Sequence, residues 1–560
     1  MSAVVRGWRR RMRESPRVRL ALLIILAAVP AGIEAAVVRG TGFTTTISLV
    51  PHITAVWPYG TFHDLLWVMV YHRSWAGFVG ESLAAIGTRA LLCTGLIALA
   101  WPPERERPQL SRLLLRNLGF SALLGAILSP WAALGVVASE VSVSWYLAGE
   151  LIPLLIMAPV LQRGGIVPGW WRGLPPLGTV VLSLVNVVTL TAGSALMWWA
   201  PPRWIVPIAA LVGGVNGILW RYAVRTALLH PGVRWKRVPV SPIVIVSVAV
   251  LVFVVADLTL LGGHGREQRE PDPIAELEAA SDGHPAIFLA GYDSDYTGEP
   301  SGRTLPVLRF SYRGLDRDGH PRPYPALATH QSLSTSATLL ARQVEQVNRR
   351  TGRPVALLAE SEGAFVAHFY LQTMPHPGVD RVAYLSPPIR AGRIYYPPQD
   401  RNAGWGIATG WELRAIFAIL SATNGLPNSA DEPFIRSLMD SAPLFRGNRL
   451  LCPERGVKTI AFLPTSDAIT VSPSIHPRVP VVEVTAVHGI LIDDPSARRR
   501  LSVFIESGRQ EQRRVWGYAA LQWAGAAWQA PSLRVPWNPA WRAVAGRSNQ
   551  NFKPDECPAR

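Results

Sequence analysis

The sequence predicts a multi-domain protein, in which an all-α membrane domain precedes an α/β domain with a mostly parallel sheet. Up to about residue 262, long apolar stretches alternate with short arginine-bearing loops. Beyond that point charge, proline and glycine are spread evenly, as in a soluble domain. From residue 285 short β-rich runs alternate with helical stretches, and strands joined through helices pair in parallel. A chain of 560 residues is long enough for both domains.

The composition divides the chain into four regions and argues against a nucleic-acid partner. The regions are a multi-pass transmembrane domain (1–262), a linker (263–284), the α/β domain (285–510, with an insertion at about 388–456) and an aromatic-rich tail (511–560). The formal net charge is +17, but residues 1–262 carry 22 Lys and Arg against 9 Asp and Glu. Most of the excess therefore lies in the membrane half, where basic loops set orientation.

About seven segments of the first region approach the roughly 20 apolar residues that cross a bilayer. They are residues 18–38, 77–101, 117–138, 145–161, 176–199, 205–220 and 239–262. Arginine is abundant at the N-terminus and in the even-numbered connections and sparse in the odd-numbered ones, which places the N-terminus in the cytoplasm. Seven crossings then place the α/β domain outside the cytoplasm, with the lipid bilayer as the expected partner.

Two further features of this region are assigned to the membrane surface. Segment 51–74 is rich in aromatic residues, which is typical of a segment lying flat on the outer surface. Several ionisable residues lie close to span ends, which favours interfacial placement over a buried functional role. These residues are Glu34, Glu81, Arg89, Glu150 and Asp257. No repeat or ion-binding motif indicates a transporter.

The second region has six strand candidates and three helix candidates around the insertion. The strands are expected at Ala286–Ala290, Val307–Tyr312, Val355–Ala359, Arg381–Leu385, Thr459–Leu463 and Val481–Thr485, and the helices at Ser334–Arg349, Gly363–Gln372 and Ala497–Ser507. Active sites of parallel sheets lie at the carboxyl ends of the strands. Residues directly after these strands are therefore the candidates for chemistry.

Three residues at such strand ends form a candidate catalytic triad. Ser361 lies in Ala359-Glu360-Ser361-Glu362-Gly363, a small-x-Ser-x-Gly turn between a strand and a helix. Asp467 and His488 follow the next-to-last and last strands. A serine hydroxyl becomes a nucleophile when a neutral imidazole removes its proton and a carboxylate orients that imidazole. Ser361 is thus the predicted nucleophile, His488 the general base and acid, and Asp467 the orienting acid.

At these residues the chain resembles the α/β-hydrolase superfamily, over roughly residues 285–507. His488-Gly489-Ile490-Leu491 is similar to the family's terminal histidine loop, and Thr465-Ser466-Asp467-Ala468-Ile469 to its acid turn. The resemblance implies a membrane-anchored serine hydrolase of the esterase or lipase kind, without a cofactor. The alternatives are an acyltransferase with the same triad, or a non-catalytic transporter or scaffold with a hydrolase-like binding domain.

The same resemblance requires two donors for the oxyanion. The backbone N–H of Glu362 is one, from its position after the nucleophile, and the second is expected at Tyr292 or Gly291, after the first strand. Ala359 stands where the family usually has glycine, and no His-Gly-Gly-Gly motif is present. The aromatic and apolar insertion is expected to cap the site, which favours a lipid or another acyl-ester substrate.

Each residue of the triad also has an ordinary structural explanation. Ser361 can be a helix N-cap, Asp467 a turn residue and His488 a surface histidine. Their common order and their positions after strands favour the triad. Asp293 and Asp295 resemble half of a calcium loop, but the spacing fails beyond them, so no metal is expected.

The cysteines and the tail leave alternatives open. The three cysteines form no CxxC pair, which gives no support for zinc or redox chemistry. Cys452 and Cys557 are either free thiols or a disulfide in an oxidising compartment, since spacing does not decide geometry. The tail tryptophans are expected to rest on the α/β domain rather than on the membrane. The oligomeric state stays open.

Overall fold

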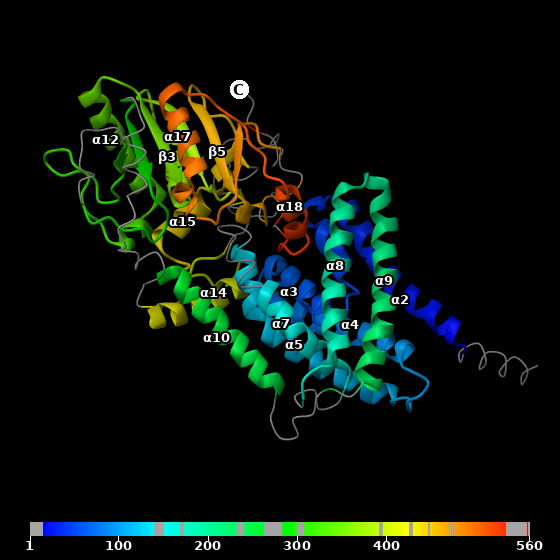
Figure 1. The fold of residues 1–560 in the computed structure, drawn as a ribbon. Coiled ribbons are helices and arrows are strands. Elements are labelled where there is room, and N and C mark those ends of the chain that lie inside the picture. The colour runs from blue at the N-terminus through cyan, green and yellow to red at the C-terminus, as the bar shows by residue number, and fades with distance from the viewer. Residues whose placement is uncertain are drawn as a thin grey trace, which may run out of the picture.

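The computed structural model describes two regions, one built of helices and one built around a sheet (Figure 1). The described residues are 15–138, 151–167, 173–230, 232, 240–261, 283–298, 307–390, 396–424, 429–445, 448–469, 471, 473, 476–531, 533 and 557. The predicted linker lies outside the described residues except for its last two positions.

Five helices of the first region are long and apolar enough to cross a membrane. They are α2 (Pro16–Thr41), α4 (Trp75–Ala100), α5 (Leu110–Ala138), α8 (Leu177–Trp199) and α9 (Ile205–Leu229), the last preceded by the short helix η3 (Pro202–Trp204). Each overlaps a predicted span. The remaining two predicted spans overlap shorter apolar stretches in α7 (Ile152–Ile166) and α10 (Val240–Leu261). The helices therefore indicate a membrane protein with at least five candidate crossings in the described part of the chain.

The segment between α2 and α4 is inserted among these helices instead of lying on the membrane surface. It contains the 3-10 helix η1 (Thr44–His52) and the helix α3 (Tyr59–Tyr71). Trp57 and Tyr59 are fully buried, and Trp57 packs edge-on against Trp220 of α9. The surface placement predicted for residues 51–74 is therefore wrong, because protein covers the aromatic rings.

Spanning helices supply hydrogen bonds to the irregular backbone of this inserted segment. Asn216 Nδ2 donates to the carbonyl of Pro51 at 2.9 Å, and Trp220 Nε1 donates to that of Thr54 at 3.0 Å. Within a bundle of apolar helices, a carbonyl without such a donor costs several kcal/mol. The polar side chains of α9 therefore offset the cost of burying a non-helical segment.

Two of the predicted interfacial residues are instead paired inside the helical region. Arg89 of α4 donates to both carboxylate oxygens of Asp64, at 2.7 and 2.6 Å, and is 3% exposed. Glu34 of α2 lies 2.7 Å from Nε2 of His63. The interfacial prediction is wrong for Glu34 and Arg89, because charged partners on α3 balance their charge within the protein.

The second region contains a six-stranded sheet whose pairs are all parallel, which confirms the predicted parallel sheet. Its strands are β1 (Ala286–Leu289), β2 (Val307–Arg309), β3 (Val355–Glu360), β4 (Val379–Leu385), β5 (Lys458–Pro464) and β6 (Val481–Val484), in the order β2-β1-β3-β4-β5-β6. The order reverses between β1 and β3, and in open parallel sheets ligands bind beyond the carboxyl ends of the strands at such a point.

Helices cover both faces of the sheet. On one face, Leu357 and Ala359 of β3 pack in a core with α12 (Leu333–Thr351) and α13 (Glu362–Thr373). On the other face, Leu358 packs in a core with α17 (Pro495–Ser507). Alternate residues of β3 thus face opposite layers, and because both layers are apolar the strand is apolar up to Ala359 and ends in a buried Glu360.

The insertion forms helices that join the sheet region to the helical region. They are α14 (Ile407–Asn424), α15 (Pro433–Asp440), α16 (Ala442–Phe445) and η5 (Arg449–Leu451). Thr409 of α14 donates to the carbonyl of Met69 at 2.7 Å, and the N–H of Ala408 donates to Nε2 of His72 at 2.9 Å. Figure 1 shows α14 beside α3 and α10. The insertion therefore contacts the helical region as well as the sheet.

The tail enters the helical region too. Its helix α18 (Tyr518–Ala526) packs against α8, and Trp528 beyond it is 2% exposed and donates to Oγ1 of Thr191 at 3.1 Å (Figure 1). Trp516 is fully solvent-exposed. The prediction that the tail tryptophans rest on the α/β domain is wrong for these two residues, and Trp537 and Trp541 lie outside the described residues.

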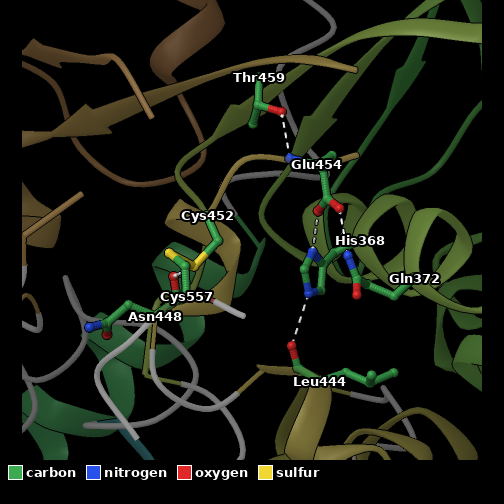
Figure 2. Close-up of a disulfide and its surroundings, with 8 residues drawn as sticks. All are labelled: His368, Gln372, Leu444, Asn448, Cys452, Glu454, Thr459 and Cys557. Carbon is green, nitrogen blue, oxygen red and sulfur yellow. Dashed lines mark hydrogen bonds and ion pairs between the residues drawn. A yellow bond between two sulfur atoms is a disulfide. The ribbon is translucent and has the colours of Figure 1, made fainter. Parts of the chain in front are cut away.

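Cys452 and Cys557 form a disulfide, the second of the two alternatives that the sequence left open (Figure 2). Cys452 directly follows η5, and the bond joins the end of the tail to the segment before β5. Figure 2 shows it near the buried pair of His368 and Glu454, whose Nδ1 and Oε1 atoms are 2.6 Å apart. The bond closes a loop with a sequence separation of 105 residues.

Cys452→Ser should lower the free energy of unfolding by about 2–4 kcal/mol, because the unfolded chain regains the entropy that this long loop removes. Urea unfolding of the full chain in detergent, with and without reductant, measures the effect. Reductant should lower the stability of the wild type to that of the variant and leave the variant unchanged. Cys93→Ala, which loses a buried free thiol but keeps the disulfide, should still respond to reductant. A wild type that does not respond contradicts the prediction.

Candidate active site

Ser361 lies in a strained turn between β3 and α13, at the carboxyl end of the sheet. Its φ of 50° and ψ of −111° are sparsely populated for a residue with a Cβ atom. The N–H of Ser361 donates to the carbonyl of Leu385 at 2.9 Å, which anchors the turn to β4. Gly363 permits the tight passage into α13, because a Cβ atom there would lie 2.4 Å from the carbonyl oxygen of Leu289. Ser361 is half-buried in this turn at the end of the sheet.

The structure brings the three predicted triad residues together. Nε2 of His488 lies 2.9 Å from Oγ of Ser361, and Nδ1 of His488 lies 3.0 and 3.2 Å from the carboxylate oxygens of Asp467. Asp467 belongs to the 3-10 helix η6 (Thr465–Ile469) after β5, and His488 to the loop after β6. Both distances are hydrogen-bond distances, so a proton can pass from the hydroxyl to the imidazole without any movement of the backbone.

The surroundings of His488 favour its protonated form. Burial by itself lowers the pKa of His488, but the carboxylate of Asp467, with help from Glu360, raises it above the ordinary value. Only 4% of the Asp467 side chain is exposed, so water screens this attraction weakly. The carboxylate thereby stabilises the imidazolium that would form when His488 accepts a proton.

Both glutamates beside Ser361 are buried. Burial raises the pKa of Glu360 to about 7, although a charge on His488 opposes the change. Burial, together with the carboxylates of Glu432 and Asp293, raises the pKa of Glu362 well above its ordinary value. Neither oxygen of Glu362 has a hydrogen-bond partner. Burial and the neighbouring carboxylates thus both disfavour a negative charge on Glu362 beside the serine.

The three residues predicted as oxyanion donors surround Ser361 in different ways. Glu362 is the first residue of α13, where backbone N–H groups have no partner within the helix. A Cβ atom on Gly291 would lie 3.1 Å from Cβ of Ser361, so this backbone passes directly beside the nucleophile. The hydroxyl of Tyr292 instead donates to Oε1 of Glu432. The backbone of Gly291 thus lies beside the nucleophile, and the backbone N–H of Glu362 begins the helix that follows it.

Sequence reasoning missed a second group of charged residues beside this site. His330 lies between the carboxylates of Asp293 and Glu432, with distances of 2.6 Å from Nε2 and 2.7 Å from Nδ1. The two carboxylates face opposite nitrogens of the ring and therefore do not converge on a point where a cation could bind. Within the described residues no group of His, Cys, Asp and Glu has the arrangement of a metal site. No local motif marked His330, because its partners lie 37 and 102 positions away.

One further histidine and one further aspartate have structural roles. His368 is buried against Glu454. Asp494 caps α17 by accepting the N–H of Ala497 at 2.8 Å. No protein-family model and no solved structure matches this chain. The geometry of the residues themselves therefore carries the functional argument.

Asp467→Asn should lower the pKa of His488, because the amide removes the carboxylate charge that raises it. The imidazole proton signals of the full chain, followed by NMR against pH and assigned with His488→Gln, measure this pKa. Asp316→Asn is the matched control, since it removes an exposed carboxylate that pairs with His320 in the same region. An unchanged or higher pKa for His488 in Asp467→Asn contradicts the prediction.

Proposed function

We propose that the protein is a membrane-anchored serine hydrolase that cleaves an acyl ester through Ser361, His488 and Asp467. The observation that carries the proposal is the unbroken chain of hydrogen bonds from Oγ of Ser361 through His488 to Asp467, beside a strained strand-to-helix turn. A serine that only capped a helix would accept a bond from its own helix, and Ser361 makes no such side-chain bond.

The proposed reaction has two acyl-transfer steps. Oγ of Ser361 attacks the ester carbonyl carbon while its proton moves to Nε2 of His488, and the oxyanion accepts hydrogen bonds from the backbone at positions 362 and 291. His488 then gives this proton to the departing alkoxide, which leaves an acyl group on Ser361. Water repeats the cycle and releases the acid. A second alcohol in place of water would make the protein an acyltransferase with the same residues.

The arrangement of strands supports the resemblance to α/β-hydrolases in this region. The nucleophile follows β3, the acid follows β5 and the histidine follows the last strand, in the chain order of that superfamily. The turn at Ser361 has the strained conformation that such an elbow requires. The likeness rests on order and local geometry.

A lipid or an acylated component of the cell envelope is the substrate class that we propose. The support is the position of the insertion, whose helix α14 contacts α4 and α5, two helices with membrane-spanning character, while its helix α15 contacts α12 of the sheet region. Leu413 of α14 and Met439 of α15 belong to the same apolar core as residues of α3 and α5. Long-chain esters partition into such surroundings.

We also propose that the site faces the outside of the cytoplasm. The arginine distribution along the sequence supports this orientation. The disulfide between Cys452 and Cys557 gives independent support, because such bonds persist in oxidising compartments and are rare in the cytosol.

A fluorophosphonate probe should label the wild type and leave Ser361→Ala unlabelled, because the probe reacts with activated serine hydroxyls. Hydrolysis of p-nitrophenyl butyrate should fall by about 10⁴–10⁶-fold in the same variant. Ser386→Ala is the matched control, since Ser386 also has a positive φ, follows the neighbouring strand β4 and lies outside the triad. Gel fluorescence and absorbance measure the two effects.

Failure of the folded wild type to react with the probe and with both short- and long-chain esters would contradict the hydrolase. It would favour the non-catalytic transporter or scaffold with a binding domain of this fold. Retention of labelling in Ser361→Ala would assign the reactive hydroxyl to another residue.

A protease added to intact cells should cleave the sheet region, since the proposed orientation exposes it. Immunoblotting with tags before α2 and after β6 distinguishes the two sides of the membrane. Full protection of the sheet region, with cleavage after permeabilisation, would reverse the orientation. Activity towards esters does not depend on this outcome.

A further inference from the structure

His330 joins two segments that border the candidate active site. It is the last residue of η4 (Ala326–His330). Asp293 belongs to the loop after β1, and Glu432 is the N-cap residue of α15 in the insertion. The side chains of His330, Asp293 and Glu432 are 5%, 9% and 7% exposed. Nε2 forms a hydrogen bond with Oδ1 of Asp293, and Nδ1 makes a close charge contact with Oε2 of Glu432. A ring that carries a proton on both nitrogens suits two such carboxylate neighbours.

The electrostatics of the cluster agree with a protonated His330. Burial lowers its pKa, but hydrogen bonds and attraction to Asp293 and Glu432 raise the pKa of His330 to about 9. The titratable groups that face the cluster are Tyr292 from the loop after β1 and Glu362 from α13. The positive charge of a protonated His330 offsets one of the two carboxylates that the ring faces, those of Asp293 and Glu432.

The segment that His330 holds is the one that passes beside Ser361. We call residues 291–293 the β1 loop. Asp293 has a φ of 58°, a costly conformation for a residue with a Cβ atom, and its N–H donates to Oγ1 of Thr329 at 3.1 Å. The ring of Tyr292 stacks on that of His330, with centroids 4.5 Å apart and an interplanar angle of 16°. Several contacts thus fix the β1 loop in one conformation against η4.

The insertion is part of the same arrangement. Glu432 accepts the hydroxyl of Tyr292 on one oxygen and faces His330 with the other. Loss of the charge on His330 would leave two ionised, buried carboxylates close together, which repel each other. Without this charge the β1 loop and α15 lose one of the attractions that join them, which weakens the placement of the backbone at Gly291 beside Ser361.

We infer that His330 is a positioning residue, whose imidazolium bridge between Asp293 and Glu432 holds the β1 loop in place as part of the oxyanion hole and ties it to the insertion. The inference rests on the proposed function, because an oxyanion forms only if Ser361 reacts. The bridge is fully present when the pH is below the ordinary pKa of histidine. It is lost as the pH rises through the raised pKa of His330, about 9.

Steady-state hydrolysis of p-nitrophenyl butyrate by the full chain in detergent tests the inference. His330→Gln should lower kcat about 10–100-fold and change KM less than about threefold, since the β1 loop contributes mainly to the transition state. The wild type should lose activity above about pH 9. His330→Gln should lack this descending limb and keep the rise with pH that reports deprotonation of His488.

Two more variants make the test specific. Glu432→Gln keeps the shape of the bridge but removes one charge, so its descending limb should move to lower pH. His320→Gln is the matched control, because His320 is an exposed histidine of the same region that pairs with Asp316, and it should behave as the wild type. If His330→Gln does not fold, as judged by circular dichroism, Glu432→Gln decides alone.

The outcomes separate the inference from the proposed function. A wild type that neither reacts with a fluorophosphonate nor hydrolyses the ester refutes both. An active wild type, with wild-type kcat and the same descending limb in His330→Gln and Glu432→Gln, refutes only the role of His330. A lower kcat with an unchanged descending limb also overturns the inference, because it shows a structural effect without the imidazolium.

Discussion

The hydrogen bond between Nε2 of His488 and Oγ of Ser361 depends on the whole sheet region. The two residues are 127 positions apart, and they meet because parallel pairing brings the carboxyl ends of β3 and β6 to one edge of the sheet. The contact also requires the strained turn at Ser361, which the tight packing of Gly363 on Leu289 maintains. The packing of the sheet region thus offsets the conformational free energy of the strained backbone at Ser361.

Those parts of the fold that follow from local patterns were predictable from the sequence. β3 is apolar up to Ala359 because both its faces are covered, and the Gly363 position marks the turn that follows it. The same pattern of an apolar strand followed by polar residues located Asp467 and His488. Each lies a few residues after such a strand. Parallel topology then brought three strand ends together without any further information.

Features that depend on a distant partner were not predictable in this way. An aromatic-rich segment has the same composition whether it faces lipid headgroups or protein, and only the polar side chains of α9 show that residues 51–74 are buried. Arg89 looked interfacial because its partner Asp64 lies on another helix. His330 escaped notice for the same reason, since neither carboxylate that it bridges is near it in the chain.

The helical region contributes more to the candidate site than attachment to a membrane. Asp467 lies in η6, which packs against α18, and α18 packs in turn against α8 of the helical region. On the insertion side, α14 is bonded to residues at the end of α3, and α15 of the same insertion supplies Glu432 to the bridge beside Ser361. Contacts with several helices therefore hold Asp467 and the insertion in place. A single membrane-spanning helix would not provide these contacts. The positions of Asp467 and of the insertion depend on contacts that the sheet region does not make by itself. This gives a physical reason for several helices next to the sheet region.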